Sequence, residues 1–186
     1  MILIINCGTN HLEDIKNHLK SFNCLSRVIG LDEIKGFDFS SFSGIIISGA
    51  PTLLTKSDLG KYLELFQFVK KVKIPILGIC LGHQLIGLLY GAKVYLGNNI
   101  NKMETIEIIE KDQIFEGILD KSLFREEHSE YIDLPLDFIL LAKSKSCNNE
   151  AMKHKEKDIY GVQFHPEVSF EIGKKVLENF VRVCKG

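Results

Sequence analysis

Short apolar runs alternate with helix-like patterns through the first half of the chain. Residues 2–5, 44–48 and 76–79 are apolar stretches of strand length, and the run at 44–48 shows no polar alternation. A strand of this kind is buried on both faces, which requires helices on either side of it. The alternation therefore predicts an α/β fold in which a central, mostly parallel, twisted sheet is flanked by helices.

Four helices are predicted from apolar spacing and from signals at their ends. Asn10 and Glu13 form the pattern of a capping box, which opens the first helix. The second helix ends before Pro75, and a short third helix ends near Gly91. Ser169 opens the last helix, so helices and strands alternate up to the third one.

The second half of the chain has a different pattern, in which short strands follow one another through turns. This pattern predicts a smaller antiparallel region beside the parallel sheet. No Gly/Ser-rich linker, repeat or low-complexity tract interrupts it, so we expect a single domain over residues 1–186. The predicted strands are 102–109, 138–142, 149–153 and 159–164.

Charge and cysteine content indicate the compartment and exclude some partners. The 24 acidic and 23 basic residues leave a formal net charge of -1, which gives no sign of a nucleic-acid or membrane partner. The N-terminal segment lacks a basic leader, and no apolar run approaches the roughly 18 residues of a membrane span. An odd number of cysteines without a CxxC pair favours reduced thiols. We therefore expect a cytoplasmic protein; its cysteines are Cys7, Cys24, Cys80, Cys147 and Cys184.

The segment PILGICLGHQ, residues 75–84, is an apolar strand that leads through a turn into a helix, with Cys80 at the corner. A side chain at such a corner projects clear of the sheet, and Gly78 and Gly82 let neighbouring backbone approach it. The following helix N-terminus favours a thiolate and offers N–H groups to an oxyanion. A lone cysteine after an apolar strand is otherwise a small buried hydrophobe. The corner by itself leaves both interpretations open.

A second motif, YGVQFHPE at residues 160–167, supplies a base for that thiol. Pro166 favours an extended conformation at His165, and alternate residues of an extended segment face the same side. Glu167 is therefore expected to hold one imidazole nitrogen and leave the other free to take the proton of Cys80. The two motifs together predict a nucleophile, a base and an orienting carboxylate.

These motifs resemble the signatures of the class I, or triad, glutamine amidotransferases. GICLGHQ at 78–84 and GVQFHPE at 161–167 stand in the family's order and separation, and SGAP at 48–51 is similar to its SGGP loop. The resemblance covers nearly the whole chain. It implies a flavodoxin-like fold and a glutaminase that hydrolyses L-glutamine to glutamate and ammonia through a cysteine thioester.

By this resemblance Cys80 is the nucleophile, His165 the base and Glu167 its partner. The implied oxyanion-hole donors are the backbone N–H groups of Ala50 and Leu81. The implied glutamine-binding residues are Gly49, Gln84, His128 and Ser129. Family members often have glycine where this chain has Ala50, so a positive φ there would strain the alanine by about 1 to 2 kcal/mol.

The resemblance also implies a partner, a synthetase subunit that uses the ammonia. The segment around 142–167 is most similar to glutaminase subunits of two-subunit GMP synthetase, whose ATP pyrophosphatase subunit converts XMP to GMP. His128-Ser-Glu130 is also similar to the glutaminase subunits of anthranilate and aminodeoxychorismate synthases. Further alternatives are a free-standing γ-glutamyl hydrolase and a catalytically silent regulatory subunit. No cofactor is expected on this chain, and ATP and Mg²⁺ are expected on the partner.

The remaining histidines have simpler interpretations. Cys80 and His83 make a CxxH pair, but two ligands without two more are weak evidence for a metal, and no metal site is predicted. His83 is expected to pack behind the corner. The other three stand among polar residues and are predicted to be solvated: His11, His18 and His154. The charge run at 153–158 predicts an exposed turn, and a docking surface would have the same composition.

Overall fold

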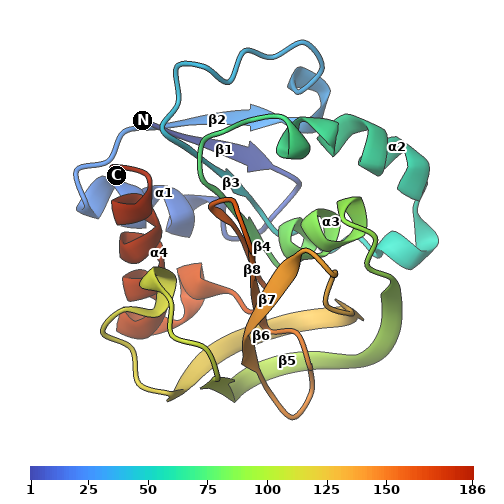
Figure 1. Ribbon diagram of the computed structural model, residues 1–186, viewed down its shortest axis with the longest axis vertical. Helices are drawn as coiled ribbons and strands as arrows, with labels where there is room; N and C mark the ends of the chain where they lie inside the picture. The colour runs from blue at the N-terminus through green and yellow to red at the C-terminus, as the bar shows by residue number, and fades with distance from the viewer.

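The computed structural model describes residues 1–186 (Figure 1). Its nine strands form one mixed sheet in the order β2-β1-β3-β4-β9-β8-β7-β5-β6. The first five in that order pair in parallel, and the rest pair antiparallel. The parallel strands are β1 (Ile2–Asn6), β2 (Ser26–Gly30), β3 (Gly44–Ile47), β4 (Ile76–Ile79) and β9 (Ile159–Val162). The antiparallel strands are β5 (Val94–Ile108), β6 (Lys121–Ile132), β7 (Phe138–Lys143) and β8 (Ala151–His154).

Helices cover both faces of the parallel strands, which explains why these strands are apolar throughout. Ile2 and Ile4 of β1 join the core cluster that contains residues of α1 and α4. Leu3 and Ile5 point the other way and join the cluster that contains residues of α3. The helices are α1 (Leu12–Ser21), α2 (Leu59–Leu65), α3 (Leu81–Leu89) and α4 (Phe170–Val183). Short 3₁₀ helices span Leu31–Glu33, Leu54–Lys56, Phe66–Lys70, Gln113–Phe115 and Pro166–Val168.

The predicted α/β class and the mostly parallel sheet with an antiparallel region are confirmed. Strand β4 has the predicted bounds, and Gly91 follows the third helix with φ of 91°. Ser169 is the N-cap residue of α4. These elements were predictable because their signals are local: a buried run, a left-handed glycine and a small polar residue before a helix.

Three predictions about elements were wrong. The N-cap of α1 is His11 rather than Asn10, and it makes no side-chain capping bond. The pattern after residue 57 is a seven-residue α-helix that tightens into a 3₁₀ helix. The predicted strand 102–109 is only the second half of β5, and all of β6 was missed. Figure 1 shows β5 and β6 as a long hairpin at the edge of the sheet.

No helix of the structure combines the length and the apolar character that crossing a bilayer requires.

Candidate active site

Cys80 occupies the corner between β4 and α3. Its φ of 49° and ψ of -102° are sparsely populated for a residue with a side chain, a conformation that costs on the order of 1 to 3 kcal/mol. Its N–H donates to the carbonyl of Val162 on β9, 2.8 Å away, which helps to fix the corner. A Cβ on Gly78 would lie 2.5 Å from the carbonyl carbon of Gly82, so both glycines serve close backbone packing.

His165 follows β9 and is held at both its backbone and its ring. Its N–H donates to the carbonyl of Arg125 on β6 at 2.8 Å. Its Nδ1 donates to Oε1 of Glu167, also at 2.8 Å, which leaves Nε2 free for the thiol. Burial lowers the pKa of His165, but the charge of Glu167 and hydrogen bonds with Cys80 and Glu167 outweigh it and hold that pKa well above its usual value. The ring is therefore suited to accept a proton.

Gly49 shows how closely the thiol and the imidazole approach each other. A Cβ on Gly49 would lie 3.0 Å from Cε1 of His165 and 3.4 Å from Cβ of Cys80. The two catalytic candidates, distant in sequence, therefore meet beside the same glycine. A larger residue here would push the base away from the nucleophile.

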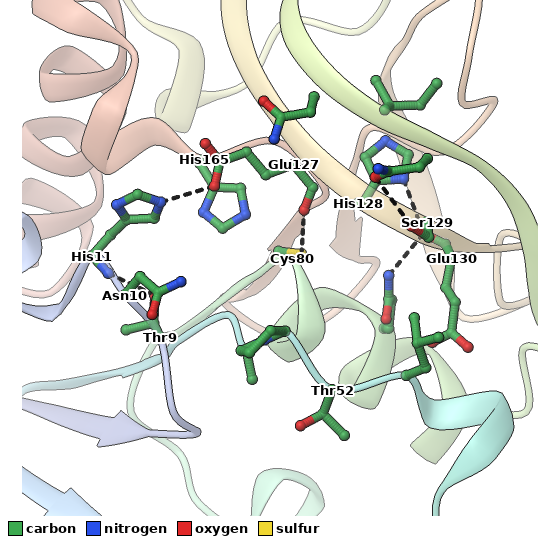
Figure 2. A pocket seen from close by; sticks show the side chains of 17 residues that line it. Thr9, Asn10, His11, Thr52, Cys80, Glu127, His128, Ser129, Glu130 and His165 are labelled. Carbon is green, nitrogen blue, oxygen red and sulfur yellow. Dashed lines mark hydrogen bonds and ion pairs between the residues drawn. The ribbon is translucent and has the colours of Figure 1, made fainter.

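The thiol opens into a cavity of about 250 Å³ lined mainly by polar residues. Figure 2 shows Cys80 and His165 on one side of it and the β6 residues Glu127 to Glu130 on another. Of the residues implied by the family resemblance, these line the cavity: Ala50, Cys80, Gln84, His128, Ser129 and His165. Glu167 lies behind the imidazole, and Gly49 and Leu81 flank the thiol through their backbone.

The N–H groups of Ala50 and Leu81 make no hydrogen bond within the chain, so both are available to an oxyanion. The strain considered for Ala50 does not arise, because its φ is not positive. Ser48 fixes this loop, since its hydroxyl accepts from the N–H of Cys7 at 2.9 Å and donates to the carbonyl of Gly49 at 3.0 Å. Alanine is therefore compatible with the geometry of the loop.

Gln84 and Glu130 connect the elbow helix to β6. The side-chain amide of Gln84 donates to the carbonyl of Glu130 at 2.9 Å and to Oε1 of Gln163 at 3.1 Å. The buried carboxylate of Glu130 accepts from the N–H groups of Leu54 and Thr55 at 2.7 and 2.9 Å. These bonds hold three separate segments around the cavity.

A buried acidic cluster lies beyond His128. Glu126 and Glu150 are fully buried, and Oε2 of Glu126 lies 3.2 Å from Nε2 of His128. Burial raises the pKa of Glu126 to about 7, and burial together with the charge of Glu126 raises the pKa of Glu150 well above its usual value. Burial also lowers the pKa of His128. A proton held by Glu126 is thus shared with a neutral imidazole.

Sequence reasoning missed Glu127 and misplaced the other histidines. His11 lines the cavity, and Nε2 of His18 donates to the carbonyl of Glu167 at 3.0 Å. His154 is buried against Tyr90 and Phe138. None of the three is a solvated surface group, contrary to prediction. His83 is fully buried against Gly161 and does not line the cavity, as expected for a packing role.

Comparison with known proteins agrees with this geometry. The model of the family described as glutamine amidotransferase class-I matches residues 3–184. The chain belongs to the class I glutamine amidotransferases. It is therefore an enzyme of the class that takes ammonia from the side-chain amide of glutamine.

Similar proteins include curated relatives of the same length. One from Pyrococcus abyssi is 41% identical over 99% of this chain and 98% of its own, and one from Methanothermobacter thermautotrophicus is 38% identical over 100% and 98%. Both are named as the glutamine-hydrolyzing subunit of GMP synthase, one part of a larger enzyme. A crystal structure from Thermoplasma acidophilum, assigned to the same subunit, has a TM-score of 0.89 and 27% identity over 99% of this chain and 93% of that one.

Proposed function

We propose that this chain is the glutaminase subunit of a two-subunit GMP synthase and that it delivers ammonia to an ATP pyrophosphatase subunit, which converts XMP to GMP. The observation that carries the proposal is the set of relatives named as the glutamine-hydrolyzing subunit of that enzyme, about 40% identical over nearly their full length. Because those relatives have the same extent as this chain, the ammonia acceptor is assigned to another polypeptide. ATP and Mg²⁺ are assigned to that partner, and no cofactor is assigned to this chain.

The proposed reaction begins with proton transfer from Cys80 to Nε2 of His165, while Glu167 keeps Nδ1 protonated. The thiolate attacks the side-chain amide carbon of glutamine, and the N–H groups of Ala50 and Leu81 stabilise the oxyanion. The imidazolium then protonates the departing nitrogen, which leaves as ammonia. Water, activated by the same imidazole, hydrolyses the thioester and releases glutamate.

Glutamine is proposed to lie in the polar cavity with its amide at Cys80 and its amino-acid end toward β6. The residues assigned to hold it are Gly49, Gln84, His128 and Ser129. A cavity of about 250 Å³ suits a ligand of this size. The short distance from Gly49 to both catalytic candidates supports its place beside the reacting amide.

Reconstitution with an ATP pyrophosphatase subunit tests the proposal. GMP formation from XMP, ATP and Mg²⁺ is measured with either glutamine or ammonium chloride as the nitrogen source. We expect glutamine to support synthesis only when this chain is present. Cys80→Ala should abolish glutamine-dependent synthesis and leave ammonia-dependent synthesis nearly unchanged.

Other outcomes would identify the alternatives. Glutamine-dependent conversion of chorismate with a synthase subunit, and none of XMP, would replace GMP synthase by the chorismate enzymes. Full glutamine turnover without any partner would indicate a free-standing hydrolase. A glutamine-mimicking diazoketone that leaves Cys80 unmodified with and without partner would indicate a silent subunit.

A further inference from the structure

The loop between β1 and α1 presents His11 to the cavity in a fixed position. Oδ1 of Asn6 accepts from the N–H groups of Gly8 and Thr9 at 2.9 and 3.2 Å. The hydroxyl of Thr9 in turn accepts from the N–H of His11 at 3.1 Å. Because these bonds order the loop, the imidazole of His11 is held without help from a ligand.

Across the mouth of the cavity, His11 meets a carboxylate that has no other cationic partner than Arg125. Nε2 of His11 donates to Oε2 of Glu127 at 2.9 Å, and Nε of Arg125 donates to Oε1 at 2.8 Å. Burial raises the pKa of Glu127, but the bonds from His11 and Arg125 outweigh this and lower it below its usual value. The carboxylate is thus an anion whose two oxygens are both occupied.

The same residues contact both catalytic candidates. The rings of His11 and His165 meet edge to face, with centroids 5.4 Å apart at 70°. The thiol of Cys80 donates to the backbone carbonyl of Glu127 at 3.7 Å. The carbonyl of Arg125 accepts from the N–H of His165. Figure 2 shows the bond from His11 to Glu127 passing beside the imidazole of His165.

From this arrangement we propose that His11 is a positioning residue, which clasps Glu127 across the mouth of the cavity and thereby holds the imidazole of His165 against Cys80. The inference rests on the proposed role of His165 as the base. Glu167 fixes the direction of the ring within its plane, whereas His11 on one side and Gly49 on the other leave the ring no room to tilt. Neither His11 nor Glu127 is assigned a bond to glutamine.

The clasp acts on the chemical step rather than on substrate binding. A small displacement of a base from its nucleophile costs about 10- to 100-fold in rate. Loss of the His11 side chain should therefore lower kcat for glutamine by about 10-fold or more, with KM changed less than about twofold. Alkylation of Cys80 by iodoacetamide, which needs no glutamine contacts, should slow by a similar factor because the thiolate depends on His165.

Substitutions at both ends of the clasp test this in the full complex. His11→Ala and Glu127→Ala should each lower kcat, and the double variant should be no slower than the worse single variant, since both break one interaction. His11→Gln keeps a donor near the position of Nε2 and should restore most of the rate. If His11→Ala fails to fold, Glu127→Ala and His11→Gln still carry the test. Glu13→Gln, on the exposed first turn of α1, is the matched control and should leave kcat unchanged.

Several results would overturn the proposal. These are a normal kcat and normal alkylation in His11→Ala, additive losses in the double variant, failure of His11→Gln to restore the rate, or an altered KM with unchanged kcat. Failure of the proposed function looks different, because then Cys80→Ala would retain glutamine-dependent activity. A slow His11→Ala variant together with an inactive Cys80→Ala variant supports both.

Discussion

The parallel strands and the β5–β6 hairpin contribute to one cavity in different ways. The parallel strands supply the nucleophile and the base from the ends of β4 and β9, on a frame that is apolar on both faces. The hairpin supplies Glu127, His128, Ser129 and Glu130 from a strand whose buried positions include charged residues. Rigid apolar packing thus holds the reacting groups, and a polar strand covers them.

This difference teaches where each kind of substitution should be harmful. On the parallel side, any added atom meets backbone, because glycines at 78 and 82 allow α3 to lie directly on the sheet. On the hairpin, the stored cost is electrostatic, since two carboxyl groups are buried side by side. Loss of function is therefore expected on one side, and a gain of stability on the other.

Glu167→Gln, which follows a parallel strand, should have the largest effect. The glutamine can no longer stabilise the imidazolium of His165, so glutamine-dependent kcat should fall by about 10²- to 10⁴-fold. The residual rate should still exceed that of Cys80→Ala, because the nucleophile is intact. Steady-state glutaminase assays of the complex measure both variants. Equal inactivity of the two would contradict a purely orienting role for this carboxylate.

Gly82→Ala should have the next largest effect. Its Cβ would collide with the backbone carbonyl of Ile47, so α3 must move away from β3 and take the corner with it. We expect a loss of about 2 to 3 kcal/mol in the free energy of unfolding, measured by urea denaturation.

Gly60→Ala is the control for that loss. A Cβ on Gly60 would meet only Oδ1 of Asp58, at 3.5 Å, and the residue lies within α2. Alanine is favoured in a helix, so this variant should be more stable by about 0.5 to 1 kcal/mol. Similar losses in both variants would show that close packing at the corner is not the cause.

The sequence allowed prediction of the parallel side and of the elbow because their determinants are local. A buried run that ends at Cys80, and a histidine and a glutamate two residues apart before a final helix, need no knowledge of distant residues. The geometry of Cys80, His165 and Glu167 could be anticipated from these patterns. The position of Ala50 could not, since its φ depends on how Ser48 is held by Cys7.

The hairpin could not be predicted for a physical reason. The segment 121–132 alternates buried and exposed residues, but its buried positions include Glu126, His128 and Glu130, so it has no apolar periodicity. Its charges are compensated by residues far away in sequence, such as Thr55 and Glu150. His11 was misjudged for the same reason, because its partner Glu127 lies on the strand that was missed.

Glu126→Gln should have the smallest effect and the opposite sign. In the folded chain the pKa of Glu126 is about 7, above the ordinary value of 4.5, so the folded state retains a proton that the unfolded state releases between these pH values. The stability contribution of this group is therefore complete below about pH 4.5 and is lost as pH rises through 7, by roughly 3 kcal/mol at most.

A glutamine at position 126 does not titrate and can donate a hydrogen bond to His128. Glu126→Gln should accordingly be more stable than the wild type by about 1 to 3 kcal/mol at pH 8 and differ little at pH 5. Urea denaturation at both pH values measures this, with the half-exposed Glu107→Gln of β5 as a control that should change little at either. A variant less stable than the wild type at pH 8 would mean that the ionised carboxylate stabilises the hairpin, and the electrostatic contrast with the parallel strands would then be wrong.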